Sequence, residues 1–210
     1  MKNILVYGLG QTNHSWNKVI EELDKNNIKR ENPNLFELAK NYAINYENLY
    51  RAFADYCNTF KEKINLCGLS LGGILSIDYA IEYPEKTNSI ILIGTPYEIP
   101  KKMFKLQNFI FKFMPKKQFE SMGIRKNDFI NLTNSIAELD IKSKVSNIKC
   151  PTLIICGEKD NANIKSAYYL SENIKDAKLK IIENTGHIVN EENPKELSKI
   201  INEYWKEEKM

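Results

Sequence analysis

The sequence predicts an α/β domain with a mostly parallel sheet of about six strands, helices on both of its faces, and a small helical cap. Two observations favour this fold class. Short runs rich in Ile, Leu and Val recur along the chain, and stretches with helical periodicity lie between them. Continuous apolar runs of this length are typical of strands in a parallel sheet that helices cover on both faces. A chain of 210 residues fits one domain with one hydrophobic core, so we expect a single domain over residues 1–210.

Each expected strand is short, apolar and closely followed by Gly, Pro, Asn or Asp. These strands are residues 3–7, 63–67, 89–93, 152–156 and 178–182. A weaker strand is expected near residues 27–30. Amphipathic helices are expected at residues 16–25, 34–60, 73–83, 162–173 and 194–206, with a break inside the second. This alternation predicts right-handed crossovers between parallel strands.

The overall composition argues against several classes of protein. With 42% hydrophobic and 27% charged residues, the chain is ordinary for a globular domain, and disorder is not expected. No apolar run approaches the roughly 20 residues that cross a bilayer. The brief apolar run at residues 4–7 is interpreted as a strand and not as a signal peptide, so we expect a cytoplasmic protein. The net charge of +3 is too small to indicate a nucleic-acid partner.

The cysteines and histidines do not form a pattern that binds metal. No two of the four cysteines form a CxxC pair, and most of them lie in or beside apolar runs. They are Cys57, Cys67, Cys150 and Cys156. A reduced cysteine in such a place behaves as a small hydrophobic residue. The chain has only two histidines, which argues against a Cys/His zinc site. We expect neither a metal nor an organic cofactor.

Residues 97–147 interrupt the alternation, because they contain no convincing strand and are compatible with helix. An insertion between two strands would lie over the carboxyl ends of the sheet, where open α/β folds bind ligands. We therefore interpret residues 97–147, which we call the cap segment, as a small helical cap.

The composition of the cap segment leaves its role open. Within residues 97–126 there are eight Lys or Arg against two acidic residues. These charges are interpreted as a solvated face, while contact with anionic membranes and attraction of acidic substrates are minority hypotheses. Five large apolar side chains either line an acyl pocket or pack the cap on the body. They are Phe104, Phe109, Phe111, Phe113 and Met114.

The stretch GLSLG at residues 68–72 is a G-x-S-x-G pattern, directly after a predicted strand and directly before a predicted helix. A sharp turn of this kind holds the hydroxyl of Ser70 above the sheet edge, and the small residues on either side avoid clashes. The N-terminus of the following helix favours negative charge that develops beside the serine. The alternative is a glycine-rich turn in which Ser70 only caps the helix.

A serine nucleophile needs a base, and the base needs an acid that orients it. His187 lies in the loop between the last predicted strand and the last helix, which makes it the expected base. His14 lies early in the chain and is interpreted as a loop residue or a substrate contact. Asp160 is the expected acid, because it comes shortly after the strand at residues 152–156. Glu158 and Asp176 are the alternative acids.

Four motifs in this order resemble those of α/β-hydrolase-fold serine hydrolases of the esterase and lipase type, over nearly the whole chain. VYGLGQTNHSW resembles the oxyanion loop, GLSLGG the nucleophile elbow, PTLIICGEKD the acid-bearing strand end, and NTGHIVNEENPKEL the histidine loop. The order Ser70, Asp160, His187 is that of the family. The resemblance implies a triad of these three residues, with the backbone amides of Leu9 and Leu71 as donors to the oxyanion.

Three departures from the family pattern affect the expected site. Many members have histidine where Tyr7 precedes Gly8, and many also have histidine where Leu69 precedes Ser70. The oxyanion contact assigned to the amide of Leu9 does not depend on the side chain at position 7. The chain also begins at the strand before the oxyanion loop, without the family's first two strands, which is why about six strands are expected.

The resemblance implies two-step acyl transfer on a small, fairly apolar carboxylic ester or thioester as the partner. Cofactor-free lyases, haloperoxidases and lactonases share the fold and the triad, and a ligand-binding member with little turnover is a third hypothesis. Gly8 and Gly10 also suggest a dinucleotide site. However, the third glycine position is occupied by Asn13, and Glu31 is only a weak match for the expected acidic residue. The sequence does not indicate the oligomeric state.

Overall fold

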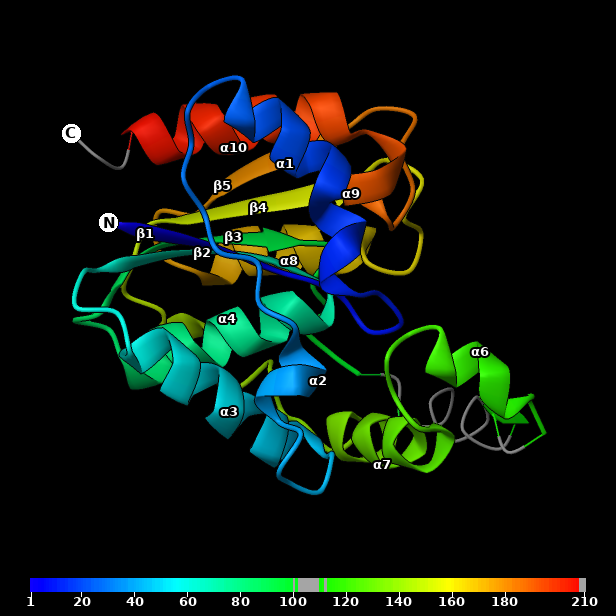
Figure 1. Cartoon of the computed structure of the whole chain (residues 1–210). Helices are drawn as coiled ribbons and strands as arrows, with labels where there is room; N and C mark the ends of the chain where they lie inside the picture. Colours follow the sequence, from blue (N-terminus) through cyan, green and yellow to red (C-terminus); the bar gives the residue numbers. More distant parts are fainter. Residues whose placement is uncertain (100, 102–109, 112, 208–210) are drawn as a thin grey trace.

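The fold is built on a five-stranded parallel sheet, in a computed structural model that describes residues 1–99, 101, 110–111 and 113–207. The strands lie side by side in chain order and all end at the same edge of the sheet (Figure 1). They are β1 (Lys2–Val6), β2 (Ile64–Leu69), β3 (Thr87–Ile93), β4 (Thr152–Gly157) and β5 (Lys178–Ile182). Every neighbouring pair is parallel. The predicted α/β fold class is therefore confirmed.

Burial explains why the apolar runs become strands. All residues of β2 and β4 are buried, and β1 and β3 each have only one residue that is partly exposed. Such strands are covered by other elements on both faces of the sheet. At the sheet edge, β5 carries the exposed residues Lys178 and Lys180. Lysines on an edge strand disfavour pairing with a strand of another molecule.

The weak strand expected near residues 27–30 is reduced to a single bridge beside β1. The amide of Glu31 donates to the carbonyl of Asn3 at 2.7 Å, and the carbonyl of Glu31 accepts from the amide of Leu5 at 3.0 Å. The next donor in a parallel ladder would come from residue 33. That residue is Pro33, which has no amide hydrogen, so the strand cannot extend.

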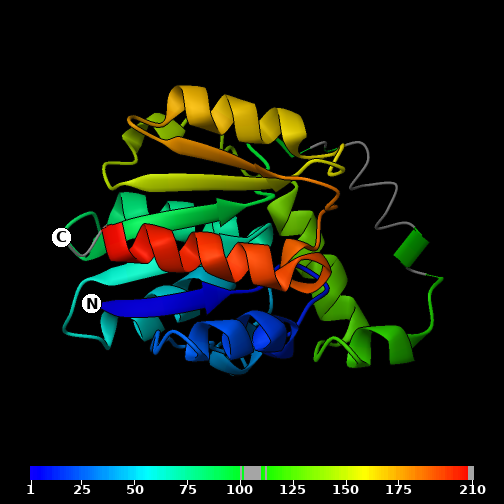
Figure 2. The ribbon, with the colours of Figure 1, turned by 90° about the horizontal axis from the view of Figure 1, so that it is seen from above.

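Helices cover the sheet in layers. On one face α1 (Asn17–Asp24) packs against α10 (Pro194–Glu207) (Figures 1 and 2). On the opposite face α4 (Leu71–Glu82) packs on β2 and β3, and α3 (Tyr46–Asn58) packs on α4 (Figure 1). Helix α8 (Ile164–Asn173) packs on β4 and β5. This arrangement leaves the carboxyl ends of the strands available for a site.

The long helix expected at residues 34–60 is broken as predicted, into α2 (Leu35–Leu38) and α3. Asn34 accepts hydrogen bonds from two amides of α2, and Asn45 accepts one from the amide of Asn48 in α3. Each asparagine therefore caps the start of its own helix.

In its described part, the cap segment contains α6 (Lys116–Glu120), α7 (Lys126–Ile136) and the 3-10 helix η2 (Val145–Asn147), and no strand. Helix α7 packs on α3, and α6 lies beyond the carboxyl ends of the strands (Figure 1). Across the described residues, no helix is long and apolar enough to cross a membrane.

Candidate active site

Ser70 stands between β2 and α4 in a backbone conformation that few residues other than glycine adopt. Its φ is 51° and its ψ is −108°. The amide of Ser70 donates to the carbonyl of Ile93, the last residue of β3, at 2.8 Å, which fixes the turn to the sheet edge. Strain of this kind is concentrated at functional sites in proteins, where the surrounding fold maintains it.

Close backbone contacts explain the small residues around this turn. A Cβ atom on Gly68 would lie 2.2 Å from the carbonyl oxygen of Gly72, and one on Gly72 would lie 2.3 Å from the carbonyl oxygen of Val6. Real Cβ atoms do not approach other atoms so closely. Larger residues at positions 68 and 72 would therefore push α4 away from the strand ends.

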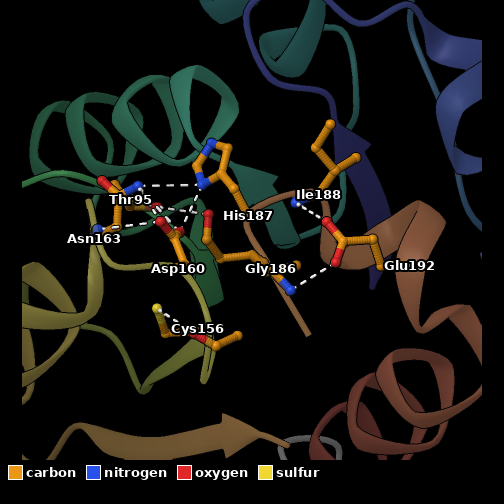
Figure 3. A network of polar contacts seen from close by, with 10 residues as sticks. Thr95, Cys156, Asp160, Asn163, Gly186, His187, Ile188 and Glu192 are labelled. Carbon is orange, nitrogen blue, oxygen red and sulfur yellow. Dashed lines mark hydrogen bonds and ion pairs between the residues drawn. The ribbon is translucent and has the colours of Figure 1, made fainter. Parts of the chain in front are cut away.

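His187 and Asp160 come from neighbouring loops and form a hydrogen-bonded pair (Figure 3). The Nδ1 atom of His187 lies 2.6 Å from Oδ2 of Asp160. Asp160 follows β4 and its side chain is 2% exposed, whereas His187 follows β5 and its side chain is 38% exposed. The carboxylate is thus buried behind an imidazole that remains accessible to a ligand.

Asn163, at the start of α8, holds the Asp160 carboxylate. Its Nδ2 lies 3.0 Å from Oδ1 and 3.1 Å from Oδ2, and its backbone amide donates to Oδ1 at 3.2 Å. Burial alone would raise the pKa of Asp160, but the hydrogen bond and charge of His187, together with the Asn163 donors, lower that pKa below its ordinary range. The ionised carboxylate accepts the Nδ1 proton, so a neutral His187 carries its free lone pair on Nε2.

The lowered pKa of Asp160 predicts a pH dependence of stability. Its ordinary value is 3.8, so at acid pH the unfolded chain binds this proton more readily than the folded chain. The stabilisation is present above the unfolded pKa and is lost as pH falls through the folded pKa. We expect the free energy of unfolding to rise with pH through this window, and Asp160→Asn to lack that increment. Urea titrations of both proteins from about pH 2 to about pH 6 measure it; identical pH profiles would contradict it.

Two contacts fix the loop that carries His187. A Cβ atom on Gly157, at the end of β4, would lie 2.2 Å from the carbonyl oxygen of Gly186, so glycine is needed for the close approach of the loops. Glu192, in the short helix α9 (Val189–Glu192), accepts from the amide of Gly186 at 2.6 Å and from that of Ile188 at 3.1 Å (Figure 3). One carboxylate therefore holds the amides on both sides of the histidine.

Ser70 and the His187–Asp160 pair both lie beside the end of β3. The amide of Ser70 is bonded to Ile93, and Gly94 follows in the chain. A Cβ atom on Gly94 would lie 3.0 Å from Nδ1 of His187 and 3.2 Å from Oδ2 of Asp160. In the described part of the chain, no hydrogen bond joins Ser70 to His187. Catalytic hydrogen bonds are often long without substrate and shorten in the complex.

The loop after β1 lies against the Ser70 turn. A Cβ atom on Gly8 would lie 3.3 Å from Cβ of Ser70 and 2.7 Å from Cδ2 of Leu69. Glycine at position 8 therefore lets the loop and the turn touch. Tyr7 does not face the site: its side chain is buried, and its hydroxyl accepts from the amide of Leu35 at 2.9 Å.

The two amides expected to bind an oxyanion, those of Leu9 and Leu71, have no acceptor among the residues that the structure describes. Leu71 is the first residue of α4, and the first amides of a helix lack a partner within it. Leu9 lies in the loop that contacts Ser70. Both donors are therefore free to bind a ligand near the serine.

The other candidate residues lie elsewhere. Glu158 is exposed and accepts from the amide of Asn184 at 2.9 Å, and Asp176 is exposed before β5. Within the described residues, neither carboxylate contacts His187. His14 lies in the 3-10 helix η1 (Asn13–Trp16) and lines a separate hollow of about 360 Å³. Nor do the described residues contain a group of three or more His, Cys, Asp or Glu that could hold a metal ion.

The cysteines are free and buried, as the sequence predicts for core residues. Burial raises the pKa of Cys156 to about 12 and raises that of Cys67 further above its usual range. These thiols stay protonated at neutral pH and are poor nucleophiles. We therefore expect iodoacetamide to leave the folded chain unalkylated and its catalytic activity unchanged. Activity and intact mass after treatment test this, and inactivation in step with alkylation would contradict it.

The described aromatic side chains of the cap segment pack largely within the cap. The ring of Phe111 lies 6.0 Å from that of Phe119 and 5.2 Å from that of Phe129. Phe113 is 75% exposed, and Met114 is partly buried. The expected pocket residues Phe104 and Phe109 lie outside the described residues. The side chain of Phe111 therefore packs within the cap segment, which argues against its lining an acyl pocket.

Three side chains that support the site were not expected from the sequence: Gln11, Asn163 and Glu192. Asn163 had a local signal. At the start of a helix, a side chain typically accepts a hydrogen bond from the amide three residues later, and Asp160 accepts in this way from the amide of Asn163. Glu192 and Gln11 carry no local pattern that distinguishes them from other loop residues.

Comparisons with known proteins indicate the family and the fold of the chain. A family model described as BAAT / Acyl-CoA thioester hydrolase C terminal matches residues 45–193. The chain is similar to the proline iminopeptidase of Saccharolobus solfataricus, with 28% identity over 193 residues, which covers 68% of this chain and 62% of that protein. It spans less than two thirds of the length of the curated relatives it matches first, which are covered to 65% and 62%.

Solved structures share the fold over nearly the whole chain. A thermophilic esterase from Thermogutta terrifontis superposes with a TM-score of 0.79 at 18% identity, covering 99% of this chain and 90% of that one. The enol-lactonase from Burkholderia xenovorans LB400 superposes with a TM-score of 0.81 at 18% identity, covering 98% and 91%. Both show that the α/β-hydrolase fold is the fold of this chain.

Proposed function

This chain belongs to the BAAT / acyl-CoA thioester hydrolase C-terminal family, and we propose that it is a serine hydrolase that cleaves a small, fairly apolar carboxylic ester or thioester. One observation carries the proposal: Nδ1 of His187 lies 2.6 Å from the buried carboxylate of Asp160, at the strand end that also fixes Ser70. A histidine oriented in this way presents Nε2 as a base to a neighbouring hydroxyl.

In the first half-reaction, Oγ of Ser70 attacks the carbonyl carbon while Nε2 of His187 takes the hydroxyl proton. Asp160 keeps the Nδ1 proton in place and stabilises the imidazolium. The carbonyl oxygen becomes an oxyanion, which the amides of Leu9 and Leu71 bind. One such donor contributes about 3–4 kcal/mol in a well-studied serine hydrolase. His187 then gives its proton to the leaving alcohol or thiol as the ester bond breaks.

In the second half-reaction, water attacks the acyl-serine. His187 takes a proton from this water and returns a proton to Oγ of Ser70 when the acyl group leaves as a carboxylic acid. The same oxyanion contacts serve both halves. Every proton is exchanged through one imidazole, so the reaction requires only the three side chains, the two amides and water.

The proposed substrate class follows from the family and from the fold neighbours. The description of the matched family names thioester hydrolysis, and one structural neighbour is an esterase. Another neighbour is an enol-lactonase, and a lactone is a cyclic ester that the same groups could attack. We propose that the cap segment lies over the acyl group. Met122 of the cap segment approaches the loop beside Ser70, since its Sδ would lie 4.0 Å from a Cβ atom on Gly10.

A substrate panel tests the proposed function. It contains p-nitrophenyl esters and matched thioesters with acyl chains from two to ten carbons, a γ-lactone, and an amino-acid p-nitroanilide. We expect turnover of a short or medium ester or thioester, with a stopped-flow burst that reports the acyl-enzyme. A burst without steady turnover would favour the ligand-binding alternative. If a folded chain turns over only the lactone or only the anilide, the proposed substrate class is wrong.

A further inference from the structure

Gln11 joins the loop beside Ser70 to the helix that follows His187. Its Nε2 donates to Oδ1 of Asn190 and to Oε1 of Glu191, both at 3.1 Å. Both acceptors belong to α9. These contacts connect segments that are 179 and 180 residues apart in the chain. Gln11 and Asn190 are buried, so water does not readily replace the amide of Gln11.

Gln11 also holds both peptides that meet at Gly8: its side chain binds the Tyr7–Gly8 peptide, and its backbone amide binds the Gly8–Leu9 peptide that carries the proposed oxyanion donor. Oε1 of Gln11 accepts from the amide of Gly8 at 3.1 Å, and the backbone amide of Gln11 donates to the carbonyl of Gly8 at 3.1 Å. Gly10 stands inside this four-residue turn with a φ of 84°, which glycine adopts without strain. Gly8 is thus held at both its amide and its carbonyl by one residue.

The direction of the Leu9 amide follows from the bond between the backbone amide of Gln11 and the carbonyl of Gly8, while the side chain of Gln11 fixes the neighbouring Tyr7–Gly8 peptide. In a trans peptide the C=O and the next N–H point in opposite directions, and the described chain contains no cis peptide bond. The carbonyl of Gly8 points into the turn, toward the amide of Gln11. The amide of Leu9 therefore points out of the turn, away from Gln11. Rotation of this peptide plane would turn the donor away from an acceptor beside Ser70.

We propose that Gln11 is a positioning residue that aligns the oxyanion donor of Leu9 with the loop of His187. Helix α9 begins two residues after the histidine, and Glu192 in it holds the amides on both sides of His187. A second contact reinforces the link, because Nδ2 of Asn190 donates to the carbonyl of Ser15 at 3.0 Å. The inference rests on the proposed function, since it assigns a role to the same site.

Gln11→Met tests this role, because it keeps the length of the side chain and removes its hydrogen bonds. The matched control is Asn65→Leu. Asn65 is also a buried amide with several hydrogen bonds, including one from its Nδ2 to Oδ1 of Asn3 at 2.8 Å. It lies near the start of β2, at the opposite end of the strand from Ser70. Both variants lose stability, which thermal unfolding measures, but only Gln11→Met is expected to change catalysis.

We expect Gln11→Met to lower kcat by about tenfold or more, with KM within about twofold of the original value. The affinity for an alkyl boronic acid should fall by a similar factor, because its serine adduct places a hydroxyl where the oxyanion forms. A loss of packing alone would lower the melting temperature but leave kcat, KM and the boronic acid affinity unchanged. Asn65→Leu should behave in that second way.

If Gln11→Met fails to fold, a second pair of variants tests the proposal by exchanging the amide and the carboxylate between positions 11 and 191. Gln11→Glu places a carboxylate against Glu191 and should lower kcat. Adding Glu191→Gln supplies a new donor for that carboxylate and should restore kcat to within about threefold of the original, about 0.7 kcal/mol. An unchanged kcat in Gln11→Glu, or a lowered kcat that Glu191→Gln does not restore, would overturn the assignment.

Failure of the proposed function would look different. If the unmodified chain hydrolyses no ester or thioester and Ser70→Ala does not alter its reactivity, the proposed function fails and the role of Gln11 falls with it. If the unmodified chain is active, Ser70→Ala is inactive, and Gln11→Met retains full kcat and full boronic acid affinity, only the inference about Gln11 is wrong.

Discussion

Ser70→Ala is expected to lower kcat by about 10⁶-fold, since removal of the nucleophile costs about this much in a well-studied serine hydrolase. The variant lacks the only atom that can form the proposed acyl-enzyme, while the oxyanion amides and the rest of the fold stay in place. Steady-state hydrolysis of the best ester from the panel measures the loss, and circular dichroism checks that the chain is folded.

Ser76→Ala is the matched control for this loss. Ser76 lies in α4, is fully buried, and donates to the carbonyl of Gly72 at 2.7 Å. Its removal deletes one buried hydroxyl from the same helix without touching the proposed triad. Ser76→Ala should keep its kcat. Full activity in Ser70→Ala would mean that another group carries the reaction.

The strained backbone of Ser70 adds a stability comparison to the same experiment. Its φ of 51° and ψ of −108° suit glycine better than alanine. Ser70→Gly should therefore be more stable than Ser70→Ala by about 1–3 kcal/mol, the usual size of such strain, although both are inactive. Urea denaturation of the two variants measures the difference.

Asp160→Asn is expected to lower kcat by about 10⁴-fold, as replacement of the acid does in a well-studied serine protease. The amide cannot serve as the negatively charged acceptor that keeps the Nδ1 proton of His187 in place. The histidine then tends toward the tautomer whose proton is on Nε2, where a lone pair is needed. Steady-state kinetics at a pH of about 7 to 8 measures the effect.

The two alternative acids provide matched controls. Glu158→Gln and Asp176→Asn make the same chemical change at exposed carboxylates, one directly after β4 and the other just before the start of β5. Since neither contacts His187 in the described structure, both should keep kcat within about threefold of the original. A large loss in either variant, with activity retained in Asp160→Asn, would move the acid to that position.

The fold could be predicted from the sequence because its strands are buried on both faces. Each strand is then a continuous apolar run that is visible without knowledge of its neighbours, and all five runs became strands. The weaker sixth strand that was expected is only a single bridge in the structure. Residues 27–30 contain one apolar residue, Ile28, and this stretch pairs with β1 only through the following Glu31, because Pro33 prevents the ladder from continuing.

The candidate site was predictable where each residue follows a strand. Parallel strands end at one edge, so Asp160 and His187 were expected to meet there, and they do. The choice of Asp160 over Glu158, which also follows β4, could not be made from spacing alone, whereas Asp176 comes before β5 and lies at the other end of the strands. The choice depends on the turn through which Asn163 and the buried carboxylate face the histidine.

The supporting contacts could not be read from the sequence. Gln11 meets α9 only because β1 and the loop after β5 reach the same edge of the sheet, and no local pattern records that meeting. Tyr7 likewise acts in the core, where its hydroxyl accepts from the amide of Leu35 at the start of α2. Such roles depend on packing between distant segments.

The most direct test of the central claim is labelling with a fluorophosphonate, followed by intact mass, on the unmodified chain and on Ser70→Ala. An activated serine attacks the phosphorus and forms one stable adduct, whereas an ordinary serine does not react. We expect one rapid adduct on the unmodified chain and none on Ser70→Ala. A folded, unmodified chain that forms no adduct, or a Ser70→Ala variant labelled equally fast, would contradict the assignment of Ser70 as an activated nucleophile.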